Sequence, residues 1–282
     1  MASPLQKDPS TTSLSFTSWN DDKPTTIVLL HGGFTCNLEF ALVLPHLSDF
    51  HIILPDLPLH SKSRHITPGT TENSAFHVSA LIRSHAHGGR AHVVGVSMGG
   101  YIAQCLALDQ PDLVLSLFVS GAAPAVGIRS FMAQWTGFTY YCMKLMFQWL
   151  PVWLIQYQIS SQGLKVSEEL IVEMRNNITW PLFQDMFPWI VSFTLDDVRQ
   201  LKVRILSIAG AKGDDVAMIQ KTAHVLRDRR TDQDEAWPED GSGAVVIREA
   251  AHPWDMQFPE LFARGVSAWV NGDKLPVEFE RL

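Results

Sequence analysis

The sequence predicts an α/β fold in which helices flank a mostly parallel central sheet. Short apolar runs rich in β-branched residues recur along the chain, and helical patterns fall between them, as in folds built from strands and crossover helices. The runs are continuous instead of alternating, which is typical of strands buried on both faces. With 282 residues, 46% of them hydrophobic, the chain is long enough to bury a large core.

Each expected element follows from one of these patterns. The apolar runs predict strands over residues 26–31, 51–55, 92–96, 115–120, 204–209 and 244–248, with an antiparallel edge strand over 14–19. Helical patterns predict helices over residues 38–47, 74–87, 98–109, 216–229 and 259–271. An acidic stretch with Gly and Pro, residues 231–243, predicts a surface loop.

The strand rhythm stops between residues 122 and 196. This segment holds five tryptophans and several phenylalanines, and it predicts a helical lid (122–196) inserted into a core made of residues 1–121 and 197–282. Polar residues and Pro151 interrupt its most apolar part, so we expect no membrane span. The aromatic side chains either form the underside of the lid or line a pocket, and a homodimer through the lid is a further option.

The charges and cysteines limit the partners and the compartment. Lys and Arg number 22 against 29 Asp and Glu, and no basic cluster occurs, so nucleic acid is not an expected partner. Cys36, Cys105 and Cys142 are widely spaced in apolar surroundings, which predicts buried free thiols without a disulfide or a zinc site. The N-terminal residues lack the features of a secretory signal, so we expect a cytoplasmic location and treat the sequon at Asn177 as accidental.

The sequence Gly95-Val96-Ser97-Met98-Gly99 carries the strongest chemical signal. It lies between a predicted strand and a predicted helix, the setting of a nucleophile elbow. A serine on so tight a turn needs neighbours without a Cβ two residues away on either side. The start of the helix presents free N–H groups to any oxyanion that forms. Ser97 is therefore the predicted nucleophile.

With this motif the chain resembles the α/β-hydrolase superfamily over about residues 26–276. The sequence His31-Gly32-Gly33-Phe34 follows the first core strand, where the family places its second oxyanion-hole loop. The resemblance implies that the N–H of Gly33 or of Phe34 joins that of Met98 in the oxyanion hole. We expect His31 to brace this loop instead of acting as the base.

A second loop also resembles the family. In Asp56-Leu57-Pro58-Leu59-His60-Ser61, Leu59 and Ser61 replace two glycines of the family pattern, which predicts a stiffer or differently turned loop. Asp56 is expected to fix this loop.

The resemblance implies the order nucleophile, acid, base along the chain. His252 follows the last predicted core strand and is the predicted general base. The acid is expected after the strand at 204–209, where Asp214 is the first choice and Asp215 the alternative. The residue that is not the acid should interact with the start of the following helix.

These residues predict a serine hydrolase that cleaves a lipophilic ester, lactone or thioester through an acyl-enzyme, without a cofactor or a metal. Phe34, Met98 and Trp254 stand next to the motif residues and are the expected pocket wall. Two alternatives stay open. One is a non-hydrolytic enzyme of the same fold (an acyltransferase, lyase or cyclase of a secondary metabolite), and the other is a ligand sensor that retains the triad.

Overall fold

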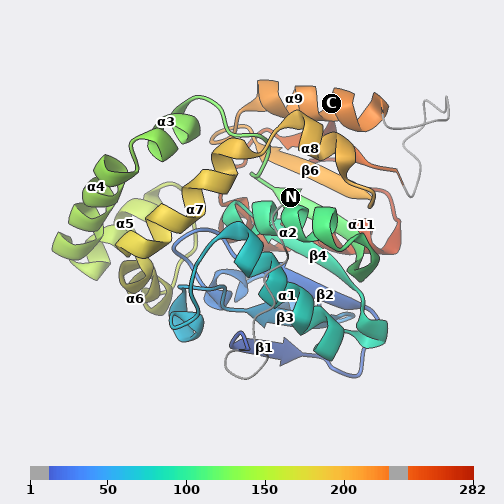
Figure 1. Cartoon of the computed structure of the whole chain (residues 1–282), viewed down its shortest axis with the longest axis horizontal. Coiled ribbons are helices and arrows are strands. Elements are labelled where there is room, and N and C mark those ends of the chain that lie inside the picture. Colours follow the sequence, from blue (N-terminus) through green and yellow to red (C-terminus); the bar gives the residue numbers. More distant parts are fainter. Residues whose placement is uncertain (1–12, 229–240) are drawn as a thin grey trace, which may run out of the picture.

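An eight-stranded sheet forms the centre of the protein (Figure 1). The computed structural model describes residues 13–228 and 241–282, and in them the strand order is β1-β3-β2-β4-β5-β6-β7-β8. The strands are β1 (Phe16–Trp19), β2 (Thr26–Leu30), β3 (His51–Pro55), β4 (Ala91–Val96), β5 (Val114–Ser120), β6 (Ile205–Gly210), β7 (Gly243–Ile247) and β8 (Glu280–Arg281). The six inner strands are parallel, and β1 and β8 run antiparallel at the edges. The predicted fold class is confirmed, with one short strand, β8, that no pattern indicated.

Helices cover both faces of the sheet. On one face lie α1 (Thr71–His85), α2 (Met98–Asp109) and α9 (Val216–Asp228), and on the other lie α10 (Trp254–Gln257) and α11 (Pro259–Asn271). Alternate residues of β2 reach the two layers, because Val28 and Leu30 join the core beneath α1 and α2 while Ile27 and Leu29 join the core beneath α11. Burial on both faces explains the continuous apolar run in the sequence.

Six helices lie between β5 and β6, in the segment predicted as a lid. They are α3 (Ile128–Gln134), α4 (Thr136–Trp149), α5 (Val152–Ser161), α6 (Glu168–Asn177), α7 (Trp180–Ser192) and α8 (Leu195–Gln200). Helix α7 contacts α1 and α2 of the core and also α3 and α4, so it joins the outer helices to the core (Figure 1). Because α8 spans residues 195–200, the boundary predicted between residues 196 and 197 falls inside a helix. Helix α8 packs against α9.

The outer helices α4 and α5 present large aromatic side chains to solvent. Tyr141, Trp149, Trp153 and Tyr157 are between 65% and 78% exposed. Exposed aromatic side chains are enriched at interaction sites, so the homodimer through the lid stays a prediction. None of the helices in residues 13–228 and 241–282 is long and apolar enough to cross a membrane.

The structure corrects the predictions for one helix and for one cysteine. The helix predicted over 38–47 is replaced by two 3₁₀ helices, Asn37–Phe40 and Leu44–His46, because Pro45 cannot donate a backbone hydrogen bond. Cys142 is exposed, whereas Cys36 and Cys105 are buried as expected, and burial raises the pKa of the Cys36 thiol to about 12. Most of the predicted acidic loop, residues 231–240, lies outside the described residues.

Candidate active site

Ser97 lies on a strained turn between β4 and α2. Its backbone has φ 52° and ψ −117°, which residues other than glycine rarely adopt. A Cβ on Gly95 would lie 2.4 Å from the carbonyl oxygen of Gly99, and a Cβ on Gly99 would lie 2.2 Å from that of Leu30. The close approach of β4, α2 and β2 therefore requires both glycines, as the motif predicted.

His252 and Asp214 form a hydrogen bond at the carboxyl end of the sheet. Nδ1 of His252 lies 2.6 Å from Oδ1 of Asp214, and the other carboxylate oxygen accepts the N–H of Gly210 at 2.8 Å. The Asp214 side chain is 3% exposed and the His252 side chain 28%. A buried carboxylate on Nδ1 fixes the orientation of the imidazole, so Nε2 is the nitrogen suited to proton transfer.

Three glycines make room for the histidine loop. A Cβ on Gly121 would lie 2.4 Å from Cε1 of His252, and a Cβ on Gly213 would lie 2.7 Å from its backbone nitrogen. A Cβ on Gly210 would lie 2.2 Å from the carbonyl oxygen of Ala251. The loops that follow β5 and β6 therefore pack directly against the loop that carries His252.

Backbone contacts place Ser97 at the same carboxyl end of the sheet. Its N–H donates to the carbonyl oxygen of Ser120 at 2.8 Å, and the next residue, Gly121, is the one that contacts the imidazole of His252. The predicted nucleophile, base and acid thus follow three different strands at the carboxyl end of the sheet, and the loop after β5 links Ser97 to the His252–Asp214 pair. Their chain order is the one implied by the resemblance.

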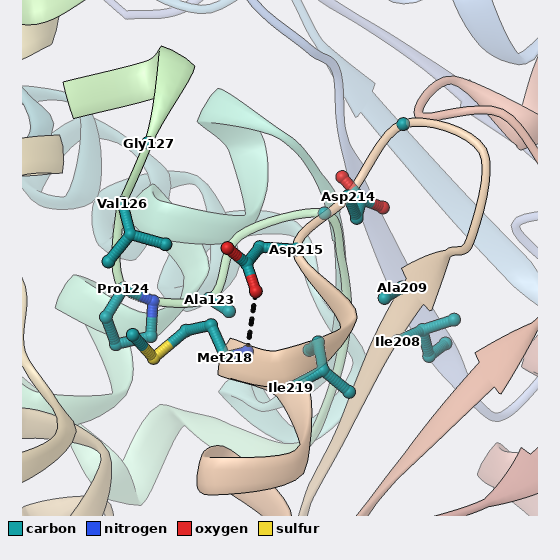
Figure 2. A pocket seen from close by; sticks show the side chains of 12 residues that line it. Ala123, Pro124, Val126, Gly127, Ile208, Ala209, Asp214, Asp215, Met218 and Ile219 are labelled. Atoms are coloured by element: carbon teal, nitrogen blue, oxygen red, sulfur yellow. Dashed lines mark hydrogen bonds between the residues drawn. The ribbon is translucent and has the colours of Figure 1, made fainter. Parts of the chain in front are cut away.

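Asp215 has another role. Its Oδ1 accepts the N–H of Met218 at 2.8 Å and so caps the start of α9 (Figure 2). The structure therefore brings Asp214, and not Asp215, to His252. Both carboxylates lie at a pocket of about 230 Å³ whose other lining is mostly apolar. That lining includes Ala123, Pro124, Val126, Ile208, Met218 and Ile219.

Gly33 and Met98 are the candidate oxyanion donors. Met98 is the first residue of α2, so its N–H has no partner within the helix. Gly33 lies beside it, since a Cβ on Gly33 would be 3.9 Å from the Cβ of Met98. The N–H of Phe34 instead donates to Nε2 of His60 at 3.3 Å. The prediction of Phe34 as an oxyanion donor is therefore corrected, because that amide already has an acceptor.

Two neutral histidines brace the loops around this site. Burial lowers the pKa of His60 to about 4, and burial together with the neighbouring His60 lowers the pKa of His31 well below its usual value. In each ring Nδ1 donates to a backbone carbonyl oxygen at 2.8 Å, that of Gly32 for His31 and that of Pro58 for His60. Nε2 of His31 accepts the N–H of Leu57 at 3.0 Å. His31 thus braces the loop, as predicted.

The loop that follows β3 keeps a turn that glycine would favour. Leu59 and Ser61, which replace the family's glycines, have φ 65° and 43°, so the turn persists at a strain of about 1 to 2 kcal/mol for each residue. Asp56 is fully buried and accepts the N–H of Asn37 at 3.1 Å, which fits the expected loop-fixing role.

The predicted pocket wall is partly wrong. The Phe34 ring stacks on Phe183 of α7 with centroids 4.9 Å apart, and Met98 packs in the same apolar cluster. Trp254 instead lies fully buried on the opposite face of the sheet, where its indole N–H donates to Oγ of Ser120 at 2.7 Å. The core buries the large indole and also satisfies its donor, so this side chain does not line a pocket.

Two residues of the inserted helices lie at the candidate site although the sequence did not predict them there. The sulfur of Met186, on α7, would lie 3.2 Å from a Cβ on Gly33, so this side chain covers the candidate oxyanion loop. Asn177, on α6, hydrogen-bonds to the backbone of the same loop. Only the sequon pattern drew attention to Asn177, and a single methionine carries no signal at all.

The chemistry available here is that of a hydroxyl, an imidazole, a carboxylate and backbone N–H donors. This set suits nucleophilic attack on a carbonyl carbon. Across the described parts of the chain, no group of three or more His, Cys, Asp or Glu side chains is arranged to hold a metal ion.

Known proteins resemble this chain in sequence and in fold. A family model described as alpha/beta hydrolase fold matches residues 25–150. An AB hydrolase superfamily protein of Gibberella zeae is 30% identical over 265 residues, which cover 90% of this chain and 83% of the relative. A 2-succinyl-6-hydroxy-2,4-cyclohexadiene-1-carboxylate synthase of Pectobacterium atrosepticum is 33% identical over 101 residues, or 36% of this chain and 40% of the synthase. A thermophilic esterase from Thermogutta terrifontis has the same fold, with a TM-score of 0.65 and 20% identity over 92% of this chain and 93% of the esterase.

Proposed function

Because this chain belongs to the α/β-hydrolase family, we propose that it is a serine hydrolase that cleaves a lipophilic ester, lactone or thioester. Ser97 is the proposed nucleophile, His252 the general base and Asp214 the acid that orients it. The observation that carries the proposal is the 2.6 Å hydrogen bond between Nδ1 of His252 and Oδ1 of Asp214, beside the strained turn of Ser97.

In the proposed acylation step, Nε2 of His252 takes the proton of Ser97 as Oγ attacks the carbonyl carbon. The tetrahedral oxyanion accepts hydrogen bonds from the N–H groups of Met98 and Gly33, each of which stabilises the transition state by about 3 kcal/mol. The imidazolium then gives its proton to the leaving oxygen or sulfur. Asp214 remains ionised throughout and stabilises the imidazolium.

In the proposed deacylation step, His252 removes a proton from water as the water attacks the acyl-enzyme. The same oxyanion donors act again, and the carboxylic acid leaves as Ser97 regains its proton. The balanced reaction consumes one water for each acyl bond that is broken.

The side chains around Ser97 support a lipophilic substrate. Phe34 and Phe183 stack on each other, and side-chain atoms of Met98 and Met186 lie within 4 Å of a Cβ built on Gly33. Apolar walls with few polar anchors favour ligands of the same character.

Labelling with a fluorophosphonate and hydrolysis of p-nitrophenyl esters of rising chain length test this proposal. The wild type should be labelled and should release nitrophenol, and Ser97→Ala should do neither while keeping the melting temperature of the wild type. Ser84→Ala is the matched control, because Ser84 is an exposed serine on α1. Labelling or hydrolysis that survives in Ser97→Ala contradicts the assignment.

A non-hydrolytic reaction is the second candidate function, because two relatives are named as synthases, one of them as a putative one. Turnover in ¹⁸O-labelled water separates the two. Hydrolysis places one ¹⁸O atom in the acid product, whereas a lyase, transfer or cyclisation reaction places none there. A protein that fluorophosphonate labels but that releases no acid from any ester of the series favours the second candidate.

A further inference from the structure

Asn177, the last residue of α6, is fully buried, and its side-chain amide makes four hydrogen bonds to the core. Nδ2 donates to the carbonyl oxygens of Phe34 and Thr35 at 3.0 and 2.8 Å. Oδ1 accepts the N–H of Ser61 and a guanidinium N–H of Arg64, both at 2.9 Å. Both donor hydrogens and the acceptor oxygen of this amide are therefore in use.

The two loops that Asn177 joins are both strained. Phe34 has φ 70° and Ser61 has φ 43°, and neither residue is a glycine. Each such conformation costs about 1 to 2 kcal/mol and persists only where surrounding contacts impose it. The amide supplies such a contact at both positions, although it lies 143 residues from Phe34 in the chain.

Phe34 is held on both sides of its Cα. Nε2 of His60 accepts its N–H at 3.3 Å, Asn177 binds its carbonyl oxygen, and its ring stacks on Phe183 of α7. The hydrogen bond to His60 fixes the peptide plane between Gly33 and Phe34, and the hydrogen bond to Asn177 fixes the plane between Phe34 and Thr35. The N–H of Gly33 lies in the plane just before these two, so its direction is restricted through the backbone of the same loop.

We propose that Asn177 is a positioning residue that couples the seating of helix α6 on the core to the formation of the oxyanion hole. This inference rests on the proposed function of Ser97 and Gly33. When α6 is seated, the amide holds the Phe34 backbone and the donor of Gly33 points to the reacting oxygen. The same burial makes Asn177 unavailable as a glycan acceptor in the folded protein, despite its sequon.

The substitution Asn177→Asp tests the coupling selectively. A carboxylate keeps the acceptor for Ser61 and Arg64 but places oxygen against the carbonyl oxygens of Phe34 and Thr35, so only the oxyanion loop loses its partner. The matched control is Asn176→Asp, because Asn176 is the preceding residue of the same helix and is exposed.

Two measurements on the full-length protein decide the outcome. The first is the kinetics of a p-nitrophenyl ester, where we expect kcat of Asn177→Asp to fall about 10- to 100-fold with KM within about 3-fold, and Asn176→Asp to match the wild type. The second is hydrogen exchange, where the amides of residues 33–36 should lose protection in Asn177→Asp while those of β4 and β5 keep theirs. Wild-type kcat in Asn177→Asp, or a loss of protection spread over the whole core, overturns the inference.

Failure of the proposed function gives a different result. A wild type without esterase activity or fluorophosphonate labelling overturns the hydrolase proposal, and the coupling to the oxyanion hole is overturned with it. The hydrogen-exchange comparison then still shows whether Asn177 holds the 33–36 loop.

Discussion

Gly121→Ala should disable the site by displacing a single side chain. A Cβ at this position would lie 2.4 Å from Cε1 and 2.6 Å from Nδ1 of His252, whereas ordinary contact begins at 3.4 Å. The imidazole therefore has to move by about 1 Å, which is incompatible with its 2.6 Å hydrogen bond to Asp214. A displacement of this size costs about 100-fold in rate. The fold should survive, because the clash is with a side chain and not with the backbone.

Gly88→Ala provides the matched control for backbone strain. Gly88 also has φ 65°, but no atom lies within 4 Å of a Cβ built there. Both variants should lose about 1 kcal/mol of unfolding free energy, since alanine is strained at this φ in either place. Only Gly121→Ala should lose activity.

The assay is kcat/KM for a p-nitrophenyl ester, together with thermal unfolding of both variants. The expected result is an activity ratio between Gly88→Ala and Gly121→Ala of about 100 at similar melting temperatures. Equal activity in the two variants would refute the reasoning, because it would mean that His252 does not need its present position.

Three further predictions concern the acid, a buried carboxyl group and the aromatic face. Asp214→Asn should lower kcat about 10⁴-fold. Asp215→Ala should keep kcat and lose only about 1 kcal/mol of unfolding free energy, because it removes the cap of α9. Ester kinetics and denaturant titration measure the two effects, and the opposite pattern identifies Asp215 as the acid. Burial, and after it the neighbouring Glu39, raises the pKa of Asp255, so the folded state keeps a proton that the unfolded chain releases and stability should fall as pH rises above about 4. Asp255→Asn removes this pH dependence. The melting temperature of the variant minus that of the wild type should therefore increase between about pH 5 and about pH 8, and a difference that stays constant contradicts the prediction. If the exposed aromatic face pairs two copies, sedimentation velocity should give a dimer for the wild type and a monomer for Trp149→Ser, and a monomeric wild type contradicts the pairing.

Much of the fold was predictable because it follows from local chemistry. The strands are continuous apolar runs because both of their faces are buried, as the alternate contacts of Val28 and Ile27 show. The turn of Ser97 is readable for the same reason, since only glycine two residues away on either side permits it. The prediction of a helix over 38–47 was wrong, because it was based on the spacing of apolar residues and did not take into account that Pro45 lacks a backbone donor.

The order of the strands along the chain, the turn that holds Ser97 and the loop that carries His252 could all be predicted from the sequence, because they depend on residues close together in the chain. The choice between Asp214 and Asp215 required the folded structure, since two adjacent carboxylates differ solely in which one the loop after β6 turns toward His252. The folded structure also shows that Trp254 is buried in the core and that Asn177 hydrogen-bonds to Phe34, which lies 143 residues away in the chain. Such contacts depend on how distant segments pack, and no local pattern encodes that packing.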